Sequence, residues 1–291
     1  MKTQKILIAF LLNLGFSVFE FFGGVISGSY SIISDSLHDV GDALSIGVSL
    51  LLECKSKKAA DEVYTYGYER FSLIGALFTT SILIFGSSFI IINAVEKIAN
   101  PVKISYEKMI IFAIAGTLVN SISAFVTRGK NSPNQRAVNL HMLEDVLGWI
   151  CVLAGAVIMY FTDFYIIDPI MSIAVSLFII YHSLGNFGNI FCIFLNRVPE
   201  GLSVSKIRED LVKVHGITDI HHIHIWSHVT GKNLATMHIV TTENTNEIKQ
   251  KVRDKLREHG IDDVTLEIEN ENDVCMESHF DLNKNREPYT L

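Results

Sequence analysis

Long apolar segments alternate with short polar ones over the first two thirds of the chain. Each apolar segment is close to the roughly 20 residues that a helix needs to cross the hydrocarbon core of a bilayer. The stretches between them contain the glycine, proline, asparagine and charged residues that are typical of loops. The pattern predicts an α-helical membrane protein with six transmembrane helices, at about residues 6–27, 31–52, 72–95, 107–127, 139–161 and 165–195.

After residue 196 the long apolar runs give way to short amphipathic ones. Apolar residues at helical spacing predict helices at 203–214 and 246–259, with Ser203 capping the first and Gly260 closing the second. Alternating apolar and polar positions predict strands at 217–227, 234–240 and 264–269. We therefore expect a small α+β domain of order αββαβ. The predicted domains are residues 1–197 (six helices), 198–270 (α+β domain) and 271–291 (polar tail).

The composition agrees with a membrane protein. Hydrophobic residues make up 49% of the 291 residues, and the mean hydropathy is +0.33. The net charge of −7 argues against a nucleic acid as partner. The four cysteines lie far apart and form no CxxC pair, so the sequence predicts neither disulfides nor a thiolate zinc site.

Lysine and arginine are distributed unequally between the two sets of loops. One side of the predicted bundle has Lys2, Lys5, Lys55, Lys57, Lys58, Arg70, Arg128, Lys130, Arg136 and Arg197. The other side has only Lys97, Lys103 and Lys108. Because positively charged loops remain in the cytoplasm, both termini are predicted to be cytoplasmic, in a multi-pass protein of the cell (plasma) membrane.

Ionisable residues interrupt the second apolar segment at Asp35, His38, Asp39 and Asp42. At about 100° per residue, these four side chains share roughly a 100° arc of one helix face. Ionisable groups at membrane depth cost on the order of 2.5–3.5 kcal/mol each, and they mark ion pathways by default. The fifth segment adds His141 and Asp145, so that two helices can supply imidazoles and carboxylates to one divalent cation. The alternative is a pair of interhelical His–Asp hydrogen bonds.

Five motifs resemble those of the cation diffusion facilitator family of divalent metal/proton antiporters, and the resemblance covers nearly the whole chain. The motifs are Gly28–Asp42 (similar to D-x-x-H-x-x-x-D), Tyr66–Arg70 (YG-x-x-R), Asn139–Asp145 (HxxxD), Asp168–Ile170 (DP) and Ile220–Ser227 (HDLHxWS). The resemblance implies that the α+β domain is a ferredoxin-like cytoplasmic domain through which two subunits pair.

The resemblance also implies two metal sites. For the transport site it implies the ligands His38, Asp42, His141 and Asp145. Asp35 and Asp39 repeat the spacing one turn earlier, so they stay an alternative pair on the second helix. In the cytoplasmic domain, the implied ligands are His221, His238 and Glu269. A metal ion there would draw two domains together and couple cytosolic metal to transport, whereas histidines on an exposed strand are otherwise merely solvated.

The implied function is efflux of a divalent cation, as Zn²⁺/H⁺ antiport by alternating access around an intramembrane His2Asp2 site. Zn²⁺ is the expected substrate and the candidate regulatory ion, while Co²⁺, Fe²⁺, Cd²⁺ and Ni²⁺ stay open as substrates and K⁺ as counter-ion. A membrane-embedded zinc hydrolase, with Glu144 activating water, is the alternative from another class, but the sequence has no HExxH motif. We therefore expect a homodimeric transporter in the lipid bilayer and not an enzyme.

Overall fold

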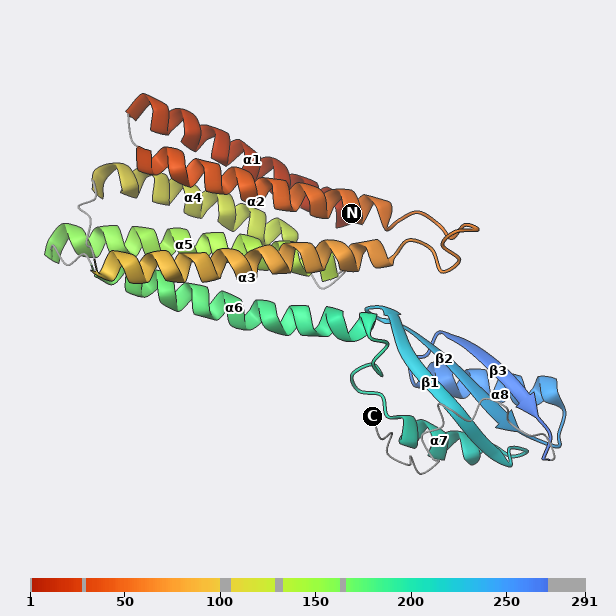
Figure 1. Cartoon of the computed structure of the whole chain (residues 1–291). Coiled ribbons are helices and arrows are strands. Elements are labelled where there is room, and N and C mark those ends of the chain that lie inside the picture. Colours follow the sequence, from red (N-terminus) through yellow and green to blue (C-terminus); the bar gives the residue numbers. More distant parts are fainter. Residues whose placement is uncertain (1, 28–29, 100–105, 129–132, 163–165, 272–291) are drawn as a thin grey trace, which may run out of the picture. The chain divides into compact units, whose positions relative to one another are not determined.

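The computed structural model of the chain describes residues 2–27, 30–99, 106–128, 133–162 and 166–271 (Figure 1). The chain divides into two compact units, Met1–Ile190 and Phe191–Leu291. We call them the helical unit and the C-terminal unit. Residues 272–291 of the predicted polar tail lie outside the described residues.

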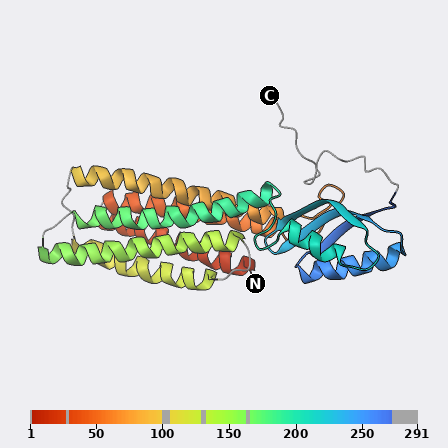
Figure 2. The same cartoon turned by 90° about the horizontal axis from the view of Figure 1, so that it is seen from below.

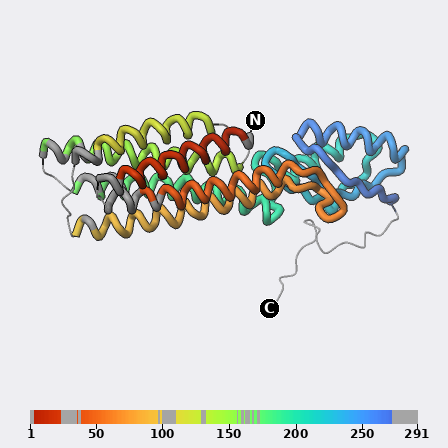
Figure 3. Tube along the Cα trace, turned by 90° about the horizontal axis from the view of Figure 1, so that it is seen from above, coloured from red at the N-terminus to blue at the C-terminus, as the bar shows by residue number. Residues whose placement is uncertain are grey.

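The helical unit is an up-and-down bundle of long helices. These are α1 (Lys2–Ser27), α2 (Tyr30–Lys55), α3 (Arg70–Ala99), α4 (Tyr106–Thr127), α5 (Pro133–Thr162) and α6 (Ile167–Phe194), of which α6 continues into the C-terminal unit. Helix α1 packs against both α2 and α4, and α5 packs against α3 and α4 (Figure 3). Helix α6 is joined to α3 where Asn186 Nδ2 donates a hydrogen bond to Thr80 Oγ1 at 3.0 Å.

Successive helices of the bundle run in opposite directions, so α2 ends and α3 begins at the same end of the unit (Figure 1). We call it the loop end. The start of α1 and the end of α4 also meet there, since Lys5 Nζ donates to the carbonyl of Arg128 at 3.2 Å. The basic residues that the sequence analysis grouped on one side of the membrane include both of these residues.

Five of the six long helices are long and apolar enough to cross a membrane. The segments are Gln4–Gly23, Arg70–Glu96, Ile110–Thr127, Pro133–Gly155 and Ile173–Phe194. Five predicted membrane-spanning segments are therefore supported by length and composition. Helix α2 is not among them, because its described part carries Asp39, Asp42 and Glu53, which lower its hydropathy. Its crossing of the membrane stays a prediction.

The predicted loop after the second helix begins too early. The sequence predicts polar loop from Glu53 onward, but α2 continues to Lys55 and Glu53 is only 2% exposed. The reason lies in other helices: Ser72 of α3 donates a hydrogen bond to Glu53 Oε2 at 2.7 Å. A residue that looks like loop in the sequence is therefore packed inside the bundle.

The fifth helix begins earlier than predicted, at Pro133 rather than near residue 139. Proline is favoured at the first helical position, where its missing N–H is not needed. The polar residues that follow it bond to the end of α4: Gln135 Nε2 donates to the carbonyl of Thr127 at 2.8 Å, and Asn139 Nδ2 to that of Ala124 at 2.7 Å. These amides satisfy carbonyls that the end of α4 leaves without helical partners.

The C-terminal unit has the predicted order αββαβ after α6. Its elements are α7 (Val204–Val212), β1 (Asp219–Val229), β2 (Lys232–Val240), α8 (Thr245–Glu258) and β3 (Asp263–Glu269). Strand β2 is the central strand, antiparallel to β1 and parallel to β3, with α8 as the crossover. As predicted, Ser203 caps α7, and Gly260 follows α8 with a left-handed φ of +75°.

Both helices of the C-terminal unit cover one face of its sheet (Figure 2). The core between them consists of Ile207 and Leu211 of α7, Ile248, Val252 and Leu256 of α8, and Ile220, Ile223, Ile225, Ala235, Met237 and Ile239 of the strands. Because side chains alternate along a strand, every second residue of β2 points to the opposite face. That face carries the polar cluster described below.

Candidate metal centres

The helical unit brings together three of the predicted transport-site ligands. Asp42 of α2 and His141 and Asp145 of α5 each offer one ligand atom, and these atoms all lie within 4.8 Å of one another. His141 and Asp145 share a face of α5 because they are four residues apart. His141 Nε2 lies 3.5 Å from Asp42 Oδ1, across the interface of the two helices.

This cluster, which we call the bundle centre, is shielded from solvent. Asp42 is 7% exposed and His141 is 2% exposed. Asp145 Oδ2 is buried and accepts no hydrogen bond from the described residues. Two carboxylates buried this close repel each other, and a cation between them would remove that cost.

The geometry of the bundle centre is close to that of a metal site but looser. Ligand bonds of about 2.0–2.1 Å in a tetrahedral zinc site place the ligand atoms about 3.3 Å apart. The separations of up to 4.8 Å therefore require small inward movements of the side chains. One imidazole and two carboxylates are three of the four ligands that the sequence analysis expects.

The other predicted ligands of the second helix are not tested by this geometry. The side chains of His38 and Asp35 lie outside the described residues, although the backbone there belongs to α2. Asp39 is half-buried and does not belong to the group formed by Asp42, His141 and Asp145. The choice between His38/Asp42 and Asp35/Asp39 therefore stays a prediction.

Glu144 has a structural partner that the sequence did not reveal. Its Oε1 accepts a hydrogen bond from Ser87 Oγ of α3. Glu144 lies directly before Asp145 on α5, so this bond links the helix of the bundle centre to α3. A serine in the middle of an apolar segment is the only sequence signal for it, and many such serines bond only to their own helix, as Ser81 and Ser88 do.

The C-terminal unit assembles the second predicted ligand set on the open face of its sheet. His221 of β1 is directly opposite His238 of β2, and His238 is opposite Glu267 of β3. Glu269 lies two residues further along β3, so it points to the same face as Glu267. The strand register therefore gathers His221, His238 and Glu269, whose ligand atoms lie within 4.8 Å of one another.

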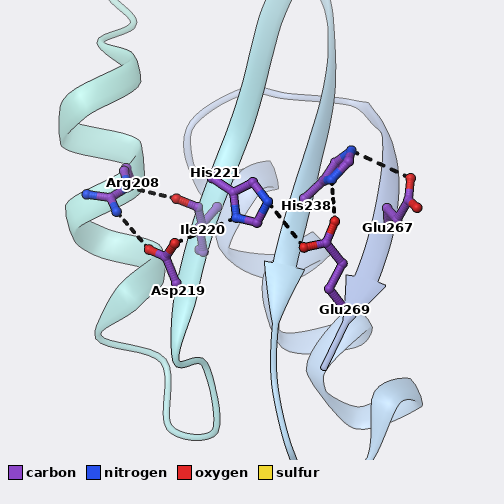
Figure 4. Close-up of polar contacts among 7 residues, drawn as sticks. All are labelled: Arg208, Asp219, Ile220, His221, His238, Glu267 and Glu269. Atoms are coloured by element: carbon purple, nitrogen blue, oxygen red, sulfur yellow. Dashed lines mark hydrogen bonds and ion pairs between the residues drawn. The ribbon is translucent and has the colours of Figure 1, made fainter. Parts of the chain in front are cut away.

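In this sheet cluster, Glu269 lies between the two histidines (Figure 4). Its Oε1 is 2.6 Å from His238 Nδ1, and its Oε2 is 3.2 Å from His221 Nε2. His238 and Glu269 are buried, at 6% and 8% exposed. Two imidazoles and one carboxylate are a donor set that zinc accepts, with one position left for water or a fourth ligand.

Each histidine of the sheet cluster has a further carboxylate beside its other ring nitrogen (Figure 4). Asp219 Oδ2 is 3.6 Å from His221 Nδ1, and Glu267 Oε2 is 3.5 Å from His238 Nε2. Arg208 of α7 contacts Asp219 Oδ1 at 2.7 Å. Metal-binding histidines usually face such a carboxylate with the nitrogen that does not bind the metal. Asp219 is not among the predicted ligands, although it lies two residues before His221 on β1 and therefore on the same face of the strand.

A β-bulge lies between His221 and His224, and His222 is the residue with an irregular backbone there. His222 adopts a left-handed φ of +50°, which is unusual for a residue with a side chain. Its ring centre lies 4.7 Å from that of His238 and 4.6 Å from that of His224. The rings of His221, His222, His224 and His238 therefore form one group, in which His222 and His238 are buried. Whether this group binds a metal ion stays a prediction.

The long apolar helices define a class, the multi-pass helical membrane proteins, and the buried carboxylate–imidazole cluster between α2 and α5 has the donor types that divalent cations bind. Residues 6–189 match the cation efflux transmembrane domain, and residues 199–271 match the cytoplasmic domain of cation efflux proteins. The chain belongs to the cation efflux family, also called the cation diffusion facilitators, which are multi-pass membrane transporters of divalent metal cations.

Curated relatives match over almost the whole chain. A Bacillus subtilis (strain 168) protein named "Cadmium, cobalt and zinc/H(+)-K(+) antiporter" is 30% identical, over 93% of this chain and 90% of its own length. The "Zinc transporter ZitB" of Yersinia pseudotuberculosis is 29% identical, over 92% of this chain and 88% of its own length. The "Cation efflux system protein CzcD" of an Alcaligenes species is 27% identical, over 92% of this chain and 87% of its own length.

Proposed function

We propose that this protein exports Zn²⁺ from the cytoplasm in exchange for protons. The observation that carries the proposal is the bundle centre, where Asp42, His141 and Asp145 come within ligand reach inside the apolar helices. The names of the relatives support it, since they describe transporters of zinc, cadmium and cobalt and one of them names H⁺ and K⁺ as counter-ions.

The donor set favours zinc. With His38 as fourth ligand, the centre would offer two imidazoles and two carboxylates, which suits tetrahedral Zn²⁺. Mg²⁺ and Ca²⁺ prefer six or more oxygen ligands, so they fit poorly. Co²⁺ and Cd²⁺ are the alternative substrates to test first, because the Bacillus subtilis relative is named for them.

Proton exchange follows from the chemistry of the ligands. Zn²⁺ binds neutral imidazole and ionised carboxylate, so metal loading displaces protons. If the centre opens alternately to the two sides of the membrane, protons from outside can expel the metal and return inward. Exchange with K⁺ is the competing mechanism.

The membrane arrangement is part of the proposal. We propose that α2 is the sixth span, that residues 1–197 form the transmembrane domain, and that residues 198–270 form a cytoplasmic domain. Basic residues at the loop end, Lys5 and Arg128 among them, support cytoplasmic termini. We further propose that two subunits pair through the C-terminal unit.

We propose that the sheet cluster binds a regulatory Zn²⁺. The donor chemistry fits, because His221, His238 and Glu269 are close together and two outer carboxylates face the histidines. These residues would hold the ion against the open face of the sheet. Zinc there would supply a positive charge that neutralises the carboxylates and draws two domains together.

Zinc flux in proteoliposomes tests the function. The wild-type protein should move Zn²⁺ when a pH gradient is imposed, and His38→Ala and Asp145→Ala should abolish this flux. Asp35→Asn and Asp39→Asn distinguish the two ligand pairs of α2. Zinc flux that persists in both His38→Ala and Asp145→Ala would rule out the bundle centre as the transport site, and flux driven only by a K⁺ gradient would rule out proton exchange.

A further inference from the structure

A stripe of buried polar residues follows α2 from the bundle centre to the loop end. Asp42, Ser45, Ser49 and Glu53 are three or four residues apart, so they share one face of the helix. They are 7%, 2%, 0% and 2% exposed. Polar residues of this kind are costly inside an apolar bundle unless they bind one another, water or an ion.

The stripe ends in a cluster that joins three helices. Glu53 Oε2 accepts hydrogen bonds from Ser72 Oγ of α3 at 2.7 Å and from Asn134 Nδ2 of α5 at 3.4 Å. Asn134 Nδ2 also donates to the carbonyl of Ser49 at 2.8 Å, and Ser49 Oγ donates to Asn134 Oδ1. A Cβ at Gly75 of α3 would lie 2.9 Å from Asn134 Oδ1, so glycine at this position makes room for the amide.

Glu53 is a buried acid whose partners are neutral. Among the described residues, its side chain contacts a hydroxyl and an amide but no lysine or arginine. A carboxylate away from water with no positive partner attracts a cation strongly. Further along the same two helices, Ser45 Oγ of α2 and Thr79 Oγ1 of α3 are buried and have no hydrogen-bond partner in the described part of the chain, so they can still bind water or a hydrated ion.

The distance between Glu53 and the bundle centre matches half a membrane. Glu53 is eleven positions after Asp42, which corresponds to about 16 Å along a helix. The hydrocarbon core of a bilayer is about 30 Å thick. If Asp42 lies near the middle of the membrane, Glu53 lies at its edge, where an ion from the aqueous side arrives.

We propose that Glu53 is the gate residue through which the divalent cation reaches Asp42 from the loop end. In the conformation described here, Ser72 and Asn134 hold its carboxylate and the three helices are closed around it. When α2 separates from α3 and α5 at this end, Glu53 exchanges these neutral donors for the cation and passes it to the bundle centre. This inference rests on the proposed transport function.

Zinc flux as a function of zinc concentration tests the role of Glu53 in the full-length protein. Glu53→Gln keeps the size of the side chain but removes its charge. We expect the half-saturating Zn²⁺ concentration to rise about tenfold, the smaller end of what charged clefts contribute to ion capture, while the maximal rate stays within twofold. Glu62→Gln, at an exposed position in the loop that follows α2, is the control and should leave both values unchanged.

A second variant makes the opposite prediction. Asn134→Asp adds a carboxylate beside Glu53, so the half-saturating Zn²⁺ concentration should fall. If wild-type protein carries zinc and Glu53→Gln keeps the wild-type half-saturating concentration, the gate proposal fails while the transport function stands. The proposal is also overturned if Glu53→Gln lowers only the maximal rate, because the charge of Glu53 then does not capture the ion. If Glu53→Gln cannot be purified folded, Asn134→Asp decides, and wild-type behaviour of that variant overturns the proposal.

Discussion

Asp219 is the residue whose substitution tests the sheet cluster most sharply. Its Oδ2 lies 3.6 Å from His221 Nδ1, while the other ring nitrogen, Nε2, faces Glu269. Arg208 holds the carboxylate in place from α7 at 2.7 Å. A carboxylate in this position fixes the orientation of a metal-binding histidine and raises its basicity. We predict that Asp219→Asn weakens Zn²⁺ binding by the C-terminal unit.

The structure sets the expected size of this effect. Removing such an outer carboxylate typically costs about 10- to 100-fold in metal affinity. The side chain of Asp219 is 45% exposed, so water screens its interaction with His221. The distance of 3.6 Å between Asp219 Oδ2 and His221 Nδ1 is also longer than a hydrogen bond. We therefore expect Asp219→Asn to lower zinc affinity by the smaller end of this range, about tenfold, or about 1.4 kcal/mol. The side chain of Glu267 is 64% exposed and no arginine holds it in the described chain, so Glu267→Gln should cost less, about threefold.

Calorimetric titration of the full-length protein with Zn²⁺ measures these affinities. The variants are compared in an Asp145→Asn background, which weakens binding at the bundle centre. Asp263→Asn is the control, because this exposed carboxylate begins β3 opposite Leu234, away from the cluster. Zinc affinity within twofold of the parent in Asp219→Asn would refute the orienting role. An equal loss in Asp263→Asn would show a general effect of charge instead.

Three further predictions concern stability. Gly216 has a φ of +97° and a Cβ there would collide with the carboxylate of Glu243, so Gly216→Ala should destabilise the C-terminal unit by about 1–3 kcal/mol in chemical denaturation. Leu211 is fully buried, and Leu211→Ala should cost about 2–5 kcal/mol in the same measurement; a loss below 1 kcal/mol would contradict its place in the core. The Lys58 ammonium lowers the pKa of the Asp61 carboxyl. Their contact therefore stabilises the loop fully at pH values above the ordinary carboxyl pKa of about 3.9, and this stabilisation is lost only as the pH falls through the lowered pKa. The protection of the loop amides against hydrogen exchange should therefore be the same at pH 7 and pH 5 in the wild type. In Asp61→Asn, these amides should exchange faster over the whole of this pH range.

The sequence was most informative where a periodic pattern and a local motif agree. The order αββαβ follows from alternating apolar positions, and Ser203 and Gly260 mark helix ends through their own backbone chemistry. The pairing of Asp42 with His141 and Asp145 was also predictable, because ionisable residues in two apolar helices have few favourable arrangements other than facing each other.

The sequence was least informative where one residue depends on a distant one. Glu53 looks like the start of a loop, and only its bonds to Ser72 and Asn134, far along the chain, explain why it is helical and buried. Asp219, by contrast, lies two residues before His221 on β1, so alternation along the strand alone puts both side chains on one face. Hydrogen bonds between elements leave no periodicity in the sequence, so no local pattern could have identified the burial of Glu53.

Helix α2 shows how one helix can be both polar and suited to a membrane. Its buried face carries Asp42, Ser45, Ser49 and Glu53, whereas Leu44 and Leu51 are 65% and 70% exposed. The polar atoms thus face neighbouring helices and the apolar side chains face outward, where lipid would contact them. Polar residues on one face lower the mean hydropathy of a helix without exposing charge to lipid. For this reason α2 is less apolar than the five candidate membrane spans. This division agrees with the proposed ion path at the interface of α2 with α3 and α5. Substitutions that place a charge at Leu44 or Leu51 should therefore impair membrane insertion, whereas those on the buried face should alter transport.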